Sequence, residues 1–420
     1  MKSYKYVIIW WWPAWLTLAN FLLKNWVEDV LLIEKEKFPR HHIWESLQPD
    51  VLDYIKEIWI RKEILDNNFL KKLWAIYKWW KYDDKWSVLY SKKLDDLWSN
   101  WEIEYEIKWF EYWYNVDRAK FDNILLNNYL NNWWKYLNNK VIDIIFKSNR
   151  IDKIILDNNE EIYWTYFIDS SWQSSLILSK LKLKIFDLYL KNTAIYTYYK
   201  WYKNLDKNLE NEFQYIENIW DSWFWWIPIS KDIVSVWMVF NSKKKFNNKD
   251  FLLKLKNTEI YNSVKNSQKC DYLWNELKDN FYFISDWSFI SKKWYWDNWF
   301  LLWDSFWFVD PILSWWVSFA MWKSILLWKI LLLIEKNKEK KDILSKKYEL
   351  IYKNDVIKYL KMAYLWYENW NSKQKWIEET WWKSNFISYI SWKERFLEND
   401  KIFQNWQNNK IKNNLRLWKD

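Results

Sequence analysis

The residues whose spacing could bind a cofactor lie at the start of the chain. Three tryptophans are spaced like the glycines of the G-x-G-x-x-G turn: Trp10, Trp12 and Trp15. They separate an apolar run over residues 4–9 from a helical pattern over residues 14–24, and a second apolar run, residues 30–33, ends at Glu34. Strand, turn, helix, strand and a later acid form the dinucleotide-binding unit. Its helix N-terminus faces the phosphates and its acid binds the adenosine ribose.

Tryptophan at these positions conflicts with that chemistry, because the turn needs residues without a side chain. The chain contains 44 tryptophans and no glycine among 420 residues, whereas average usage would give about 29 glycines. Tryptophan also follows Asn25 and Asp286 and forms the pairs Trp133–Trp134 and Trp315–Trp316, where glycine would mark turns. We expect most of these tryptophans to be glycine, as happens when UGA codons that a cell reads as glycine are translated as tryptophan. The alternative is a chain that truly lacks glycine and cannot form the dinucleotide site.

With glycine in place of tryptophan, four segments resemble one enzyme family. Residues 37–50 become KFPRHHIGESLQPD, residues 116–123 stay VDRAKFDN, residues 168–176 become IDSSGQSSL, and residues 300–321 become FLLGDSFGFVDPILSGGVSFAM. In this order and spacing they resemble the flavin-dependent halogenases and their relatives, which include geranylgeranyl-reductase-like enzymes. The resemblance extends to about residue 335.

The resemblance implies an FAD cofactor. In the family, the acid of the last segment, which is Asp304 here, holds the ribityl chain of the flavin, and the helix N-terminus that follows faces the isoalloxazine. The dinucleotide unit and the resemblance together give these expected cofactor-binding residues: Trp10, Trp12, Pro13, Ala14, Trp15, Glu34, Lys35, Arg40, Ile43, Trp44, Glu45, Ser46, Arg118, Asp169, Trp303, Asp304, Pro311, Trp315 and Trp316.

A shorter element favours halogenation over the other reactions of the family. Residues 223–228, WFWWIP, match the W-x-W-x-I-P element associated with flavin-dependent halogenases. We therefore expect Trp223 and Trp225 to be genuine tryptophans that line the substrate site with Pro228, whereas Trp226 could be either residue. In such enzymes reduced FAD and O2 give a flavin hydroperoxide, and the resulting electrophilic halogen attacks an aromatic or carrier-bound substrate.

In this family a lysine orients the electrophile. Lys85, in a segment that becomes YDDKGSVLY, resembles the K-x-G-A-x-F neighbourhood of the phenol-type halogenases but is one residue short. We take Lys85 as the candidate catalytic residue, with Lys81 as a nearby competitor. Leu313 stands where tryptophan halogenases carry a catalytic Glu. Free tryptophan is therefore not the expected substrate, and a phenol-like, pyrrole-like or carrier-bound group fits better.

Other functions stay open for such a chain. A geranylgeranyl-reductase-like enzyme would reduce isoprenoid double bonds at a membrane, and an FAD-dependent aromatic monooxygenase would transfer oxygen instead of halogen. A degenerate flavoprotein would bind flavin without turnover. For the enzymes, electrons would come from a separate flavin reductase or from NAD(P)H.

The remaining composition limits the kinds of site, partner and cellular location that we expect. His41 and His42 are the only histidines and Cys270 is the only cysteine, so the sequence offers no catalytic triad, metal site or internal disulfide. The net charge of +10 comes from lysines scattered among acids, and we expect no nucleic-acid partner. We expect a cytoplasmic protein. The apolar stretch over residues 315–335, which Lys323 and Lys329 interrupt, predicts a partly buried helix, with peripheral membrane contact left open.

These patterns predict an α/β fold with three parts. A Rossmann-like FAD-binding domain with a parallel sheet would be built from residues 1–80, 116–175 and 286–335. An inserted substrate domain with a mixed β-sheet would contain residues 81–115 and 176–285. Residues 336–420 would form a helical C-terminal region.

Overall fold

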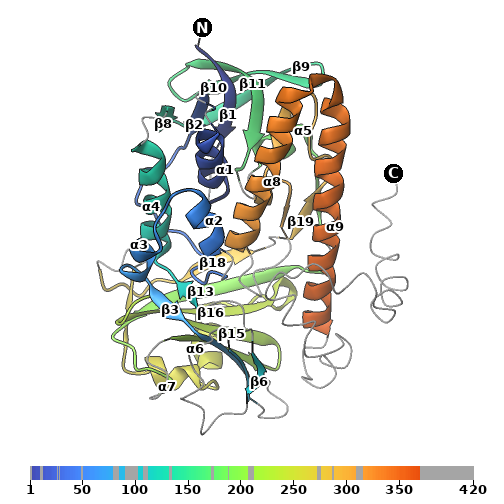
Figure 1. Ribbon diagram of the computed structural model, residues 1–420. Coiled ribbons are helices and arrows are strands. Elements are labelled where there is room, and N and C mark those ends of the chain that lie inside the picture. Colours follow the sequence, from blue (N-terminus) through green and yellow to red (C-terminus); the bar gives the residue numbers. More distant parts are fainter. Residues whose placement is uncertain are drawn as a thin grey trace.

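The computed structural model describes residues 2–9, 13–25, 27, 29–48, 51–78, 85–89, 103–106, 112–131, 135–171, 175–187, 189–206, 212–271, 276–285, 288–308 and 316–368. Two large sheets and a pair of long helices account for most of this part of the chain (Figure 1). In Figure 1 the first sheet lies at the top, beside the N-terminus, and the second lies below it.

The first sheet contains the predicted dinucleotide-binding unit. Its strands run in the order β8-β2-β1-β11-β10-β9, with β20 beside β11. The strands are β1 (Lys2–Ile9), β2 (Val30–Ile33), β8 (Lys135–Leu137), β9 (Val141–Lys147), β10 (Arg150–Leu156), β11 (Glu161–Asp169) and β20 (Trp299–Leu301). β8, β2, β1, β11 and β20 are parallel, whereas β10 is antiparallel to both β9 and β11. The second half of β1 and all of β2 are buried and mostly aliphatic, as expected for strands covered on both faces.

Helices pack around this sheet. They are α1 (Pro13–Lys24), α2 (Val51–Glu57), α3 (Lys62–Asp66), α4 (Arg118–Leu130), α5 (Leu176–Leu181), α8 (Trp316–Lys336) and α9 (Lys341–Glu368), with the short η5 (Lys338–Lys340) between the last two. α1 packs against α8 and α4, and α9 runs beside α8 (Figure 1). α9 continues to the second sheet, where the Trp366 ring lies 4.7 Å from the Trp223 ring.

α8 is long and apolar enough to cross a membrane by length and composition. In the folded chain, however, 61% of its most apolar window is buried inside the protein. Its Lys323 side chain is fully buried and forms an ion pair with Asp355 of α9. The structure therefore places α8 as the partly buried helix that the sequence predicts.

The second sheet is mixed and runs in the order β17-β13-β16-β15-β14-β4-β5-β6, with β18 also beside β13. Its strands are β4 (Trp74–Lys78), β5 (Lys85–Leu89), β6 (Ile103–Glu106), β13 (Asn192–Lys200), β14 (Phe213–Ile219), β15 (Ser222–Pro228), β16 (Ile233–Asn241), β17 (Gln268–Cys270) and β18 (Tyr282–Ser285). β4–β14 and β5–β6 are parallel pairs, and the other pairs are antiparallel. Alternate residues of β15 reach opposite faces, as the period of a strand requires. Trp223 and Trp225 join the main core, while Phe224 and Trp226 join a second core with α6 (Asn248–Leu255) and α7 (Ile260–Val264).

Several short elements complete the described part of the chain. They are the paired strands β3 (Leu70–Lys72) and β7 (Trp113–Asn115), the three-stranded group β12 (Lys184–Phe186), β19 (Phe289–Ser291) and β21 (Trp307–Phe308), and the single turns η3 (Ser242–Lys244) and η4 (Trp303–Ser305).

The predicted fold class is confirmed, because a largely parallel Rossmann-like sheet is combined with a mixed second sheet. The second sheet starts earlier in the chain than the predicted boundary at residue 81. β4 pairs in parallel with β14, so residues 74–78 already belong to it. Helix α9 continues to residue 368, and residues 369–420 lie outside the described part of the chain.

Candidate cofactor-binding and active site

The predicted cofactor turn joins the carboxyl end of β1 to the start of α1. Trp10 and Trp12 lie outside the described residues, whereas Pro13, Ala14 and Trp15 form the buried first turn of α1. Ser324 of α8 donates a hydrogen bond from its Oγ to the Ala14 carbonyl oxygen at 2.6 Å. This contact fixes the start of α1, where a helix N-terminus can bind phosphate.

Glu34 is the acid that follows β2, and it is fully buried. Burial raises the pKa of its carboxyl to about 8, although the Arg40 guanidinium, 3.4 Å from Oε2, opposes this shift. The backbone N–H of Glu36 donates to Oε1 at 2.8 Å. The carboxyl is therefore held in the place where the dinucleotide unit needs a partner for the ribose hydroxyls.

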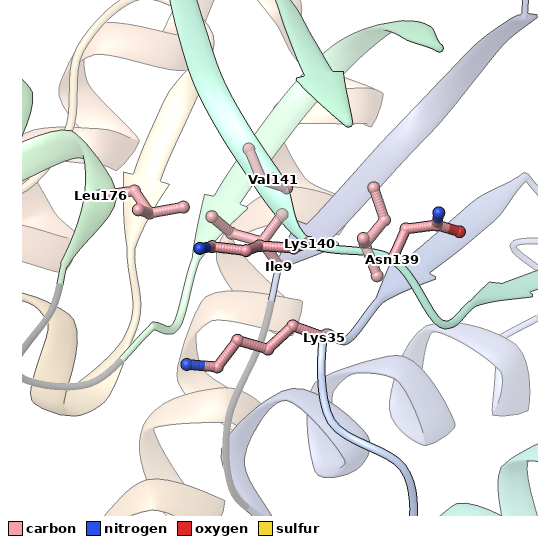
Figure 2. Close-up of a pocket in the computed structure, with 7 residues that line it drawn as sticks. Ile9, Lys35, Asn139, Lys140, Val141 and Leu176 are labelled. Atoms are coloured by element: carbon pink, nitrogen blue, oxygen red, sulfur yellow. The ribbon is translucent and has the colours of Figure 1, made fainter. Parts of the chain in front are cut away.

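A cavity of about 160 Å³ lies at the carboxyl ends of β1 and β2 (Figure 2). It is lined by Ile9, Ile33, Lys35, Asn139, Lys140, Val141 and Leu176. Figure 2 shows the Lys35 and Lys140 side chains extending in the same direction beside the aliphatic residues, and burial lowers the pKa of Lys35. Ligands of open α/β sheets bind at this edge of the sheet. The cavity would take only part of a dinucleotide, since pockets that bury drug-sized ligands measure roughly 300–1,000 Å³.

Arg118, the first residue of α4, positions the segment over residues 40–46. Its guanidinium donates to the Ile43 carbonyl oxygen at 2.5 Å and forms an ion pair with Asp122 at 2.9 Å. Burial lowers the pKa of Arg118 and raises the pKa of Asp122, and the charge of each opposes the shift of the other. The predicted flavin-contact segment thus rests on a buried ion pair.

Asp169 is the last residue of β11, and its hydrogen bonds connect two loops. Its carboxylate accepts hydrogen bonds from the backbone N–H groups of Ser171 and Ile177, each at 2.9 Å. Its carbonyl oxygen accepts from the Leu302 N–H at 2.9 Å, which places η4 beside the end of β11. Asp169 therefore brings the third and fourth predicted motifs together.

The remaining predicted cofactor residues lie around η4. Trp303 is buried and has a φ of 58°. Asp304 belongs to η4, but its side chain lies outside the described part of the structure. Pro311 and Trp315 also lie outside the described residues, and Trp316 begins α8.

Lys72 is the lysine that the structure places beside the predicted flavin-contact segment. It is fully buried on β3; its Nζ donates to the Ser46 Oγ at 2.6 Å and lies 4.4 Å from the centroid of the Trp113 ring. Burial moves its pKa well below the ordinary value, which favours the neutral amine.

Lys72 is not among the residues predicted from the sequence, although its motif is present there. Residues 72–77 are KLWAIY, which becomes a K-x-G-A-x-aromatic pattern when Trp74 is taken as glycine. Lys85 matches this pattern only in part. It lies in β5, where its backbone pairs with Lys78, and its side chain lies outside the described part of the structure, as does Lys81.

Glu45 faces the second sheet from the same segment as Ser46. Its Oε1 accepts hydrogen bonds from the Tyr198 hydroxyl at 2.7 Å and from the Ser235 Oγ at 3.4 Å. Its Oε2 is buried and has no hydrogen-bond partner among the described residues. Burial raises the pKa of Glu45 to about 7. The site therefore contains a buried acceptor atom that the described residues leave unused.

Aromatic side chains pack together around Tyr196, and we call this group the aromatic wall. Its members are His41, Tyr196, Tyr198, Trp237 and Tyr282. The Tyr196 and Trp237 rings are stacked with centroids 4.1 Å apart. Burial lowers the pKa of His41 to about 3, so its ring is neutral near pH 7. The wall is therefore aromatic and uncharged next to the Glu45 carboxyl.

The predicted substrate-lining residues Trp223, Trp225 and Pro228 are buried on β15. The Trp225 ring lies 6.5 Å from the Trp237 ring and so borders the aromatic wall. The Trp223 ring instead faces Trp366 of α9. The structure thus brings Trp225 close to the aromatic wall and places Trp223 further along β15.

The backbone of this site fits a flavin dinucleotide. The helix N-terminus, the buried Glu34 and the cavity are in the places that the adenosine half requires. Trp44 and Trp303 have φ values of 72° and 58°, the conformation that glycine adopts where a chain closely approaches a ligand. Their indole rings occupy space at the predicted flavin contacts. The described residues contain no group of three histidine, cysteine or acidic side chains that could hold a metal ion.

The chain is similar to known proteins of the kind that its sequence motifs resemble. No protein-family model matches the chain. The chain is 28% identical over 393 residues to 1H-pyrrole-2-carbonyl-(peptidyl-carrier protein) chlorinase of Pseudomonas fluorescens, an alignment that covers 87% of this chain and 84% of that protein. It is 25% identical over 334 residues to tryptophan 2-halogenase of Chondromyces crocatus, covering 76% of this chain but only 59% of that protein.

Solved structures show the same fold. The flavin-dependent brominase Bmp2 matches with a TM-score of 0.81 at 18% identity, covering 99% of this chain and 100% of that one. The myxobacterial chondrochloren halogenase CndH matches with a TM-score of 0.75 at 20% identity, covering 96% and 93%.

Proposed function

We propose that this chain, which is similar to the flavin-dependent halogenases, halogenates an aromatic ring that carries an O–H or N–H group. The enzyme is an FAD-dependent oxidoreductase. The observation that carries the proposal is the buried Lys72, whose Nζ is held by Ser46 next to the predicted flavin-contact segment. A fully buried lysine whose pKa is lowered by burial is unusual enough to need a functional reason.

FAD, when bound and reduced, supplies with O2 the oxidant that converts halide to hypohalous acid. In the proposed reaction, the Lys72 amine binds the hypohalous acid, and its hydrogen bond to Ser46 fixes the direction of Nζ. A ring carbon then forms its bond to the halogen while the halogen–oxygen bond breaks. The ring proton and the released hydroxide leave as water. Burial of Lys72 keeps bulk water away from the electrophile.

Glu45 supports an aromatic substrate with a hydrogen-bond donor. The Oε2 of Glu45 is buried without a partner among the described residues, and a phenol O–H or pyrrole N–H would satisfy it. The neutral aromatic wall offers the ring faces against which such a substrate would stack. Leu313 replaces the Glu of tryptophan halogenases, so free tryptophan is not proposed.

The substrate could reach this site alone or on a carrier. The relative from Pseudomonas fluorescens is named for a pyrrole-2-carbonyl group on a peptidyl-carrier protein. We therefore propose a carrier-bound pyrrole or a comparable small phenol as substrate, and a separate flavin reductase as the source of electrons.

The test is a reconstituted assay with FAD, a flavin reductase, NADH, O2 and either chloride or bromide. Phenol and a pyrrole-2-carbonyl carrier protein are offered separately, and the products are identified by mass spectrometry. We expect a halogenated product that requires FAD and halide. Hydroxylated product without halogen would instead make the chain a monooxygenase. Reduction of an isoprenoid double bond, with no halogenation, would favour the geranylgeranyl-reductase-like alternative.

A further inference from the structure

We propose that residues 44, 59, 201, 220 and 303 are glycine in the protein as its own cell makes it, and that residue 226 is a genuine tryptophan. Ten described residues have positive φ, and five of them are tryptophan: Trp44, Trp59, Trp201, Trp220 and Trp303. Positive φ brings Cβ too close to the backbone, so for bulky residues it is a genuine outlier. The composition predicts that most tryptophans are glycine, but it does not say which ones. The φ angles identify individual positions.

Trp59 occupies a helix-end position that is usually glycine. After α2, the N–H of Ile60 donates to the carbonyl oxygen of Ile55 at 3.2 Å, and the N–H of Trp59 donates to that of Lys56 at 3.0 Å. These two bonds define a Schellman motif with Trp59, at φ 64°, in its left-handed position. Trp59 is 58% exposed and the Lys24 Nζ lies 5.9 Å from its ring centroid, so little packing offsets the backbone conformation.

Trp220 occupies a hairpin position that is also usually glycine. β14 and β15 pair up to Ile219 and Ser222, which leaves a two-residue loop of Trp220 and Asp221. Trp220 has a φ of 54°, and Asp221 is not among the residues with positive φ. Two-residue loops with positive φ at the first position alone favour glycine there. Trp220 is 64% exposed, and Trp201, at φ 62° after β13, is similarly exposed.

Trp44 and Trp303 differ from these three because they are buried at the predicted flavin contacts. The Trp44 ring is stacked between Trp237 and Phe308, at 5.6 and 6.0 Å. Glycine at residue 44 would leave a flat space between those two rings, and glycine at residue 303 would open the start of η4. The same substitution therefore removes backbone strain and makes room for the cofactor.

Trp226 shows the opposite pattern. It lies in the middle of β15 without positive φ, and its indole N–H donates to the Ser263 Oγ at 3.0 Å. The Tyr202 and Phe213 rings pack against it at 5.6 and 5.0 Å. In contrast, several buried indole N–H groups have no acceptor among the described residues: Trp15, Trp164, Trp299 and Trp307. A hydrogen-bonded, close-packed indole is what a genuine tryptophan makes.

The test is peptide sequencing by mass spectrometry on protein purified from its native host. The tryptic peptide over residues 41–56 contains residue 44, and the peptide over residues 208–231 contains residues 220 and 226. We expect glycine at 44 and 220 and tryptophan at 226, the last two within one peptide. Tryptophan at 44 or 220 would overturn the glycine assignment. Glycine at 226 would overturn the distinction between the two classes.

A stability comparison tests the same assignment on recombinant chains made from the printed sequence. We expect W220G to raise Tm, because it removes strain and an exposed indole. We expect W226G to lower Tm, because it leaves a cavity and removes the hydrogen bond from the indole to the Ser263 Oγ. A fall in Tm for W220G, or an unchanged Tm for W226G, would contradict the assignment whether or not the chain is a halogenase.

Discussion

Lys72 is the single residue on which the proposed reaction depends most directly. Replacing it with methionine keeps a buried chain of similar length but removes Nζ, the atom that would hold the hypohalous acid. We expect K72M to lose halogenation by at least about 10²-fold, the size typical of a lost proton-handling or positioning group. FAD binding and Tm should change little, because burial already disfavours the charged form of Lys72. Steady-state assays, FAD titration and thermal unfolding measure the three quantities.

The K85M variant tests Lys85, the lysine predicted from the sequence, in the same assays as K72M. If Lys72 carries the halogen, K85M retains most of the rate. A K85M enzyme without activity beside an active K72M enzyme would return the role to Lys85.

Glu45 tests the proposed recognition of the substrate. E45Q keeps the shape but replaces an ionisable acceptor, and hydrogen bonds to charged groups contribute about 1.5–3 kcal/mol. We therefore expect KM for a phenol or pyrrole to rise by about 10-fold or more, with a smaller effect on kcat. In the wild type, kcat/KM should rise as pH passes through about 7, because only the ionised carboxyl accepts at both oxygens. The E45Q profile should lack this step.

The raised pKa of Glu45 also predicts how the free energy of unfolding changes with pH. Its pKa rises from 4.5 to about 7 on folding, so between these pH values the folded chain keeps a proton that the unfolded chain releases. The free energy of unfolding of the wild type should therefore fall, relative to E45Q, as pH rises from 4.5 to 7. Urea unfolding at several pH values checks this, and a difference that grows in the opposite direction would show that Tyr198 and Ser235 hold Glu45 ionised.

At the scale of elements, the packing of α8 against α9 depends on the Lys323–Asp355 ion pair. Lys323 is fully buried and Asp355 nearly so. D355N leaves a buried cation without its partner, and breaking such pairs costs about 3–5 kcal/mol. We expect urea unfolding to show a loss of this size.

The matched control lies on the same helix. Lys353 and Glu349 form a partly exposed pair of α9 at 2.6 Å, and exposed pairs contribute about 0–1 kcal/mol. E349Q should therefore be nearly neutral, and equal losses in the two variants would mean that α9 is destabilised by substitution in general.

Much at this scale could be predicted from the sequence, because β1, α1 and β2 are local patterns of apolar spacing. The pairing of β4 with β14 could not, since the strands are far apart in the chain and parallel pairing leaves no local signal. Lys72 was missed because Trp74 hides the glycine of its motif. Glu45 was predicted as a cofactor contact, but its bond to Tyr198 joins residues 153 positions apart and required the fold.

At the scale of the whole molecule, the cofactor site is assembled from segments spread over the chain. Glu34, Arg118, Asp169 and Trp303 come from four separate stretches, and buried hydrogen bonds connect Arg118 to residue 43 and Asp169 to residue 302. A ligand held by all of these segments binds only the folded chain. Its binding therefore adds to global stability by mass action.

FAD should accordingly stabilise a chain with glycine at residues 10, 12, 15, 44 and 303, and not a chain that keeps tryptophan at 44 and 303. At a free FAD concentration 100 times Kd, the gain in the free energy of unfolding is about 2.7 kcal/mol. The control carries glycine at 10, 12, 15, 59, 201 and 220, so it has the glycine turn and relieves the strained turns but leaves both indoles at the flavin contacts. We expect this control to unfold at a higher temperature than the printed chain and to show no shift with FAD. An equal FAD shift in the control would mean that the two indoles do not block the cofactor.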